Sequence, residues 1–212
     1  MIRKLLLGAA ALSFMAGTSA VISTGVTAAA TPVTMTGTIT CAFHGSLNFV
    51  EPLRDGGHTA TNFNLRTVLD QCSGAGTTHG PVTITHGVLT AYSSTTVVNN
   101  CGSVTAGTAL PTMYGSVAWT ATGGTVVPTS VHVTTPYMYF NYNYNLLELG
   151  LPTTITKGSY LGEKVHYGAL QSNASGDAYT GQCAAGQGGL QTVYFGQPAG
   201  GAAGIVTIKA GL

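Results

Sequence analysis

Charged side chains are scarce in this chain of 212 residues. Lys, Arg, Asp and Glu together make up 6% of it, against roughly 25% in a typical soluble domain. Thr and Gly take the place of the missing charges, so we expect hydroxyl groups and backbone to keep the protein in solution. No cluster of basic residues is present, which argues against a nucleic acid as partner. No acidic cluster indicates a calcium site.

A long apolar run is also missing. The most apolar segment, residues 5 to about 17, falls short of the roughly 20 apolar residues that a membrane-spanning helix needs. It follows Arg3 and Lys4 and precedes small residues that end at Ala28-Ala29-Ala30, the order of a secretory signal peptide with an A-x-A type cleavage site. We therefore predict that residues 1–30 are removed and that the mature chain is secreted, extracellular and without a membrane anchor. Removal leaves five Lys and Arg against six Asp and Glu, a formal charge of −1.

Motifs of nucleophilic and phosphate chemistry are absent from the sequence. It has no G-x-S-x-G elbow and no G-x-x-x-x-G-K-[ST] loop, and its cysteines are expected to be oxidised. A glycosidase needs two carboxylates across a sugar ring, but no local spacing pairs two on one strand face. We expect structural roles for the six carboxylates, Glu51, Asp55, Asp70, Glu148, Glu163 and Asp177. The sequence thus predicts no catalytic residue, no cofactor and no enzyme activity.

The histidines do not form a recognisable metal site. His79 lies in a predicted loop, seven residues before His86, and an odd separation places two residues on opposite faces of a continuous strand. A zinc site needs three or four convergent ligands, so we expect no metal. His86 shares its side of the strand with Val82 and Ile84, which favours a core histidine or a bulge at Gly87.

Cysteine occurs four times, at Cys41, Cys72, Cys101 and Cys183. No C-x-x-C pair typical of a zinc site is present, and an even number in an exported chain indicates two disulfides. Four cysteines allow three pairings, and the sequence does not decide among them. We favour Cys41–Cys72, which would join two early strands, and Cys101–Cys183, which would tie the middle of the chain to its C-terminal part.

Alternating apolar and polar residues recur about every 8–12 positions, with Gly or Pro between them. In the segment 33–43, Val33, Met35, Ile39, Cys41 and Phe43 share one face and four threonines the other, the pattern of a half-buried strand. Similar segments are 62–72, 82–92, 112–122, 126–136, 163–170, 190–196 and 204–210. No window shows the 3.6-residue period of a helix. We predict one all-β domain, residues 31–212, as an antiparallel β-sandwich of immunoglobulin-like or jelly-roll-like type, with a β-barrel as the alternative.

Residues 136–145, PYMYFNYNYN, concentrate aromatic side chains. If the segment is one strand, its residues split between two faces. The apolar face would hold Met138, Phe140, Tyr142, Tyr144 and Leu146, which we assign to the core. The polar face would hold Tyr137, Tyr139, Asn141, Asn143 and Asn145. Tyr and Asn suit binding surfaces, so Tyr137, Tyr139, Asn141 and Asn143 are the candidate ligand-binding residues.

Several short segments resemble secreted all-β proteins of actinobacteria that have no assigned activity. They are GTITCAFHGSLNF (37–49), the EPL…GG turn (51–57), LDQCSG (69–74), NNCG (99–102), CAAGQGGLQTVYFG (183–196) and the final IVTI. The resemblance implies an exported, disulfide-bonded domain and supports the favoured pairing of the cysteines. It implies no catalytic residue, and the Tyr/Asn segment is not part of it.

Three functions remain open at this stage. The leading hypothesis is a non-enzymatic exported module that serves in binding or surface structure at or outside the cell envelope. The second is a carbohydrate- or cell-wall-binding domain that uses the polar face of residues 137–145. The third is a glycoside-type hydrolase. The sequence does not specify the ligand or the oligomeric state.

Overall fold

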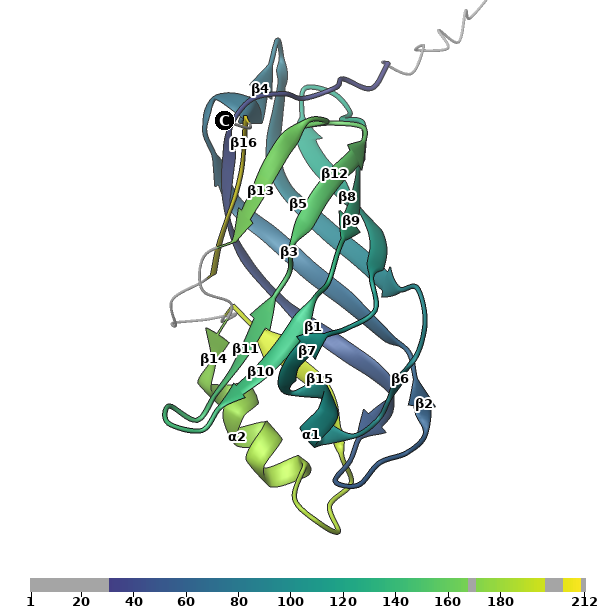
Figure 1. Cartoon of the computed structure of the whole chain (residues 1–212). Helices are drawn as coiled ribbons and strands as arrows, with labels where there is room; N and C mark the ends of the chain where they lie inside the picture. Colours follow the sequence, from purple (N-terminus) through teal and green to yellow (C-terminus); the bar gives the residue numbers. More distant parts are fainter. Residues whose placement is uncertain (1–30, 168–170, 197–203, 211–212) are drawn as a thin grey trace, which may run out of the picture.

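Eight antiparallel strands form a closed β-barrel in the computed structural model, which describes residues 31–167, 171–196 and 204–210 (Figure 1). Around the barrel the order is β1 (Ile39–Leu53), β16 (Gly204–Ala210), β13 (Glu163–Tyr167), β12 (Thr153–Lys157), β9 (Thr129–Val133), β8 (Met113–Thr122), β5 (Val82–Ser93) and β3 (Phe63–Ser73). The barrel closes because β3 also pairs with β1. The all-β prediction is confirmed; the barrel alternative fits, and the favoured sandwich is not found.

Strand β1 determines how the barrel closes, because it changes partner along its length. Residues 39–43 pair with β16, whereas residues from Gly45 onward pair with β15 (Leu190–Phe195). The change occurs at Gly45, where a Cβ atom would lie 2.3 Å from the Arg66 carbonyl oxygen. Only glycine avoids this contact, so the sharp bend of β1 depends on it. Period-two patterning is the same in sandwiches and barrels, which is why the sequence did not separate them.

A second, four-stranded sheet lies at the lower end of the molecule in Figure 1. Its order is β14 (Gln171–Ser172), β11 (Leu146–Gly150), β10 (Tyr137–Asn141) and β7 (Ala106–Ala109). Helices α1 (Cys101–Val104) and α2 (Asn173–Gln182) lie at the same end. The minor elements are β2 (Ala60–Thr61), β6 (Val97–Val98), β4 (Thr78–His79) and the 3₁₀ turn Ala75–Thr77. No helix in the described part of the chain is long and apolar enough to span a membrane.

The sequence pattern did not predict α2. Of its described side chains only Tyr179 is buried, so the helix carries no apolar stripe that a 3.6-residue period would reveal. The predicted signal peptide, residues 1–30, lies outside the described residues. The same holds for residues 168–170 of one predicted strand and for residues 197–203.

Buried apolar side chains of the barrel and of the second sheet form one continuous core. On β3, Phe63, Leu65 and Leu69 point inward as predicted. The prediction for His86 is wrong, because β5 has a bulge at Thr85 that reverses the inward side of the strand. His86 is half-exposed on the outer wall, and the bulge lies before it, not at Gly87.

Both disulfides form as favoured. Cys41–Cys72 joins β1 to the end of β3, and Cys101–Cys183 joins the start of α1 to the residue that follows α2. The second bridge spans 82 residues of sequence. It holds α2 and α1 together at the lower end of the molecule.

Tyr160 fills the upper end of the barrel. Its ring is fully buried and packs edge-on against Trp119 at a centroid distance of 5.5 Å. Its hydroxyl donates to the Gly76 carbonyl at 2.7 Å, and its backbone N–H donates to the Met35 carbonyl. Burial raises the pKa of the Tyr160 phenol far above its usual value, because the phenolate would lose its hydration.

We predict that removal of the second disulfide by the pair Cys101→Ser and Cys183→Ser lowers the free energy of unfolding by about 2–5 kcal/mol. The bridge closes a long loop, so its loss increases the conformational freedom of the unfolded chain. Urea unfolding of the variant and of wild type measures the difference. A thermal midpoint that does not change when wild type is treated with dithiothreitol would contradict the stabilising role of both bridges.

We predict that stability decreases above about pH 10, the pKa of an unperturbed tyrosine. Burial raises the pKa values of Tyr160, Tyr167 and Tyr179. The unfolded chain therefore loses these protons before the folded protein does, so full stability is present below pH 10 and falls as the pH rises further. Tyr160→Phe should reduce the decrease in the free energy of unfolding between pH 9 and 11 by about 1.4 kcal/mol. Urea unfolding over this pH range measures the change, and Tyr92→Phe, at an exposed position, is the control. If the stability of Tyr160→Phe depends on pH as that of wild type does, the prediction is contradicted.

Candidate functional site

The hairpin formed by β10 and β11 presents aromatic residues on its outer face. Met138 and Phe140 point into the core, as predicted. Tyr137 and Tyr139 point outward and are 40% and 43% exposed, and Asn141 follows on the same face. The alternation that the sequence predicted is thus confirmed for residues 137–141.

Beyond Asn141 the prediction is wrong. The strand ends there, and residues 142–145 form the turn of the hairpin. The Asn143 backbone N–H donates to Asn141 Oδ1 at 3.2 Å, and Asn145 adopts a φ of +50°, a conformation that asparagine tolerates well. Because period-two alternation stops at the turn, Tyr142 and Tyr144 are 79% and 71% exposed and do not belong to the core.

The rings of the two strand tyrosines lie along the sheet. Three ring atoms of Tyr137 lie within 2.6 Å of the position that a Cβ atom on Gly150 would occupy. Gly150 is its cross-strand partner on β11, so the ring covers the bare backbone of that strand. The Tyr139 ring lies over Gly107 of β7 in the same way, with its Cδ2 atom 3.6 Å from the position that a Cβ atom on Gly107 would occupy. Rings in this position leave one face open to solvent.

Polar groups adjoin the two rings. Glu148 is the cross-strand partner of Tyr139, and its Oε1 accepts a hydrogen bond from Asn141 Nδ2 at 3.3 Å. Asn141 therefore shapes the turn through its oxygen and orients a carboxylate through its nitrogen, while Asn143 is exposed in the turn. Glu148 was not predicted as part of this site, because only the pairing of β10 with β11 brings it beside Tyr139. We call Tyr137, Tyr139, Asn141 and Glu148, with the exposed turn residues 142–144, the hairpin surface.

Helix α2 supports the hairpin from within. The Phe140 ring packs against the Tyr179 ring at a centroid distance of 4.2 Å. The Tyr179 hydroxyl is hydrogen-bonded to Thr105 Oγ1 at 3.0 Å, and Asn145 Nδ2 donates to Asp177. Burial raises the pKa of the Tyr179 phenol, and the hydrogen bond with Thr105 opposes this shift in part.

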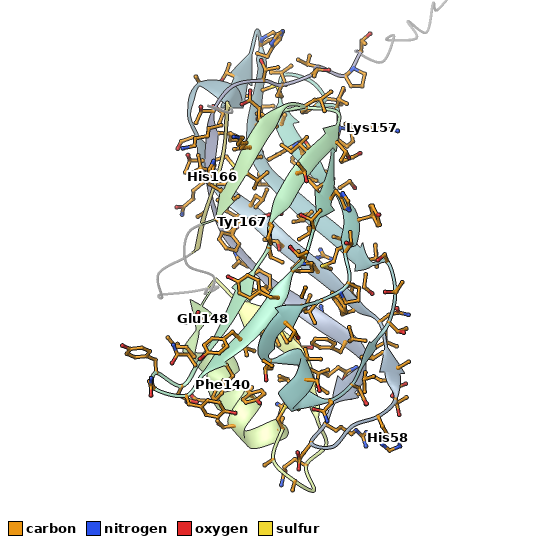
Figure 2. The ribbon with its side chains drawn as sticks, viewed as in Figure 1. His58, Phe140, Glu148, Lys157, His166 and Tyr167 are labelled. Carbon is orange, nitrogen blue, oxygen red and sulfur yellow. A yellow bond between two sulfur atoms is a disulfide. The ribbon has the colours of Figure 1, made fainter. Side chains whose placement is uncertain are left out.

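An open hollow of about 330 Å³ adjoins the hairpin surface at Tyr137. It is lined by Tyr137 of β10 and by residues of β11, of the following turn and of β13, namely Leu149, Gly150, Leu151, Pro152, Val165, His166 and Tyr167. The Tyr167 hydroxyl lies 3.1 Å from Thr153 Oγ1, and burial raises the pKa of the Tyr167 phenol. Figure 2 labels Glu148 and Phe140 on the lower sheet, with His166 and Tyr167 on the barrel above them. The volume lies within the roughly 300–1,000 Å³ of small-molecule sites.

Several carboxylates and histidines of the described residues lie in structural contacts or on the outer wall. Asp70 lies 3.6 Å from the His44 ring, and Glu163 Oε1 accepts from the Gly37 backbone N–H. His79 and His86 lie on the outside of β4 and β5. In residues 31–167, 171–196 and 204–210 no three His, Cys, Asp or Glu side chains gather in a group able to hold a metal ion.

Comparison with protein-family models, with curated proteins and with solved structures finds no match to this chain. The resemblance to secreted actinobacterial proteins therefore stays a prediction, and the function is argued from the site alone.

We predict that the Phe140–Tyr179 contact holds the hairpin in place. Tyr179→Ala leaves a cavity between α2 and β10 and should lower the free energy of unfolding by about 3 kcal/mol. Tyr179→Phe keeps the ring, loses the hydrogen bond with Thr105 and should cost about 1 kcal/mol. Urea unfolding measures both. Equal stability of Tyr179→Ala and wild type would show that the contact does not support the hairpin.

Proposed function

We propose that the protein is an exported, non-enzymatic module that binds carbohydrate on its hairpin surface. The observation that supports this most directly is the pair of tyrosine rings on the outer face of β10, with Tyr137 over β11, Tyr139 over β7 and one face of each ring open. The Cα atoms of the two residues are about 7 Å apart along the strand. A sugar ring has an apolar face of C–H groups and a rim of hydroxyls, so it can stack on a tyrosine ring and bond to groups beside it.

The neighbouring groups favour a neutral saccharide. Glu148 and the amide of Asn141 offer acceptors and donors for sugar hydroxyls, and Asn143 and the Tyr144 hydroxyl are exposed nearby. Glu148 on the surface and Asp177 behind the turn are acidic. Because no described Lys or Arg belongs to the hairpin surface, an anionic glycan would meet repulsion without a compensating charge.

The rigidity of the site supports binding without a large conformational cost. The hairpin is short, its turn is fixed by Asn141, and its inner face packs on the core and on Tyr179. A surface that is already ordered loses little entropy when a ligand binds. The two disulfides agree with an exported protein, since such bonds persist in oxidising compartments.

The arrangement of the carboxylates supports binding rather than hydrolysis. Glu148 is hydrogen-bonded to Asn141, and Asp177 accepts from Asn145, so both have roles in holding the hairpin. Turnover of a glycoside by the mature protein, lost on Glu148→Gln, would overturn the non-enzymatic part of the proposal.

We predict that wild type binds neutral glycans on a glycan array and is captured in a cell-wall pull-down. The double variant Tyr137→Ala, Tyr139→Ala should lose this binding in both assays. Each base-on-ring stack in other proteins contributes about 1–3 kcal/mol, and we expect a similar loss per ring, roughly tenfold or more in affinity. The variant Tyr137→Phe, Tyr139→Phe keeps both rings and should keep most of the binding.

Tyr114→Ala, which removes a 57% exposed tyrosine from the barrel wall, is the matched control and should bind as wild type does. Circular dichroism and the thermal midpoint establish that each variant is folded. Equal binding by the double alanine variant and wild type would rule out the hairpin surface as the site.

A further inference from the structure

A second group of polar residues lies on the outer face of β3, β1 and β15, away from the hairpin surface. Two cross-strand rows meet there: Arg66, Ser46 and Tyr194 form one, and Asn64, Asn48 and Thr192 form the other. We call these six residues the β15 platform. Arg66 and Tyr194 are exposed, the latter by 60%.

Hydrogen bonds among its members hold the platform in one arrangement. Asn48 Nδ2 donates to Ser46 Oγ at 3.0 Å and to Asn64 Oδ1 at 3.4 Å. Asn48 Oδ1 accepts from Thr192 Oγ1 at 3.0 Å. The central asparagine thus links all three strands, and the platform is ordered before any ligand arrives.

Two hollows flank the Tyr194 ring. The larger, of about 500 Å³, lies between α2 and β15 and has no charged side chain in its lining. It is bordered by Ala178, Gln182, Gln187, Gln191, Thr192 and Tyr194, together with two glycines of the loop before β15. Three glutamine amides, a hydroxyl and an aromatic ring converge on it, which is the composition of a site for a polyhydroxylated neutral group.

The smaller hollow, of about 270 Å³, is almost entirely apolar, and the exposed Arg66 side chain is on its border. His44, Ser46, Arg66, Val68 and Tyr194 line it. Within the described residues no carboxylate lies within 4 Å of the Arg66 guanidinium, and the Asp70 carboxylate lies 3.6 Å from the His44 ring. An arginine fork matches the two oxygens of a carboxylate or the oxygens of a phosphate.

We infer that the β15 platform is a second binding site, for a short acidic saccharide. One sugar unit occupies the larger hollow, which is lined by three glutamines and which we call the glutamine hollow. A sugar ring stacks on the Tyr194 ring, and the anionic group of the adjacent unit pairs with Arg66. The inference does not rest on the hairpin surface, which carries Glu148 and favours neutral glycans. The two surfaces therefore differ in the charge of the ligand that each accepts.

The test is a glycan array probed with the mature chain, followed by calorimetry with trigalacturonic acid and with its carboxyl-reduced, neutral counterpart. Array spots with carboxylated and with phosphorylated glycans show which anion is preferred. We expect binding of acidic glycans that weakens with added salt, and weaker binding of the neutral counterpart. Absence of binding to every acidic glycan on the array would overturn the inference, as would capture of single-stranded nucleic acid in preference to them.

The variants separate this site from the hairpin surface. Arg66→Gln should lower the affinity for the acidic ligand roughly tenfold to a hundredfold, because a charge-assisted hydrogen bond is lost. Tyr194→Ala should weaken binding, and Tyr194→Phe should retain most of it. Lys157→Gln removes one positive charge from β12 and is the matched control. Tyr137→Ala with Tyr139→Ala should leave the acidic ligand bound, so the failure of one site is distinguishable from that of the other.

The inference is wrong if Arg66→Gln binds the acidic ligand as wild type does, or if Lys157→Gln reduces binding by the same factor. Thermal midpoints of the Arg66 and Tyr194 variants should lie close to that of wild type, since both side chains are exposed.

Discussion

The contact between the Phe140 and Tyr179 rings joins the parts of the molecule on which the proposed function depends. Phe140 lies on the inner face of the aromatic hairpin, and Tyr179 lies on α2. Tyr179 is hydrogen-bonded to Thr105, which also bonds to the Cys101 carbonyl at 2.8 Å. Cys101 is bridged to Cys183 at the end of α2. Among the described residues of α2, Tyr179 anchors the helix in the core and the adjoining disulfide ties it to α1, and the helix in turn packs against the hairpin.

Helix α2 separates two surfaces of opposite electrostatic character. On one side lies the hairpin surface, with Glu148 beside two open tyrosine rings. On the other lies the glutamine hollow, which leads past Tyr194 to Arg66. In a chain with so few charges, the position of a single carboxylate or guanidinium decides which ligand a neutral polar surface accepts.

Alternation predicted most of the long strands because its evidence is local, whereas the short strands β7, β11 and β12 were not predicted. Phe63, Leu65 and Leu69 on β3, and Met138 and Phe140 on β10, follow strict alternation and are buried. The predictions failed where a bulge or a turn interrupts the alternation. The bulge at Thr85 places His86 on the outer side of β5, and the turn after Asn141 leaves Tyr142 and Tyr144 exposed. Closure of the barrel and the positions of Glu148 and Arg66 depend on pairing between distant strands. A single sequence does not show which distant strands pair or in which register.

The central claim is that carbohydrate binds to the open faces of Tyr137 and Tyr139. The most direct measurement is a two-dimensional NMR titration of the mature chain with the neutral glycan that binds most strongly on the array. The account predicts shift changes concentrated at Tyr137, Tyr139, Asn141 and Glu148, with saturation at one equivalent. Saturable changes at other residues with no change at these four, or none anywhere in the protein, would contradict it.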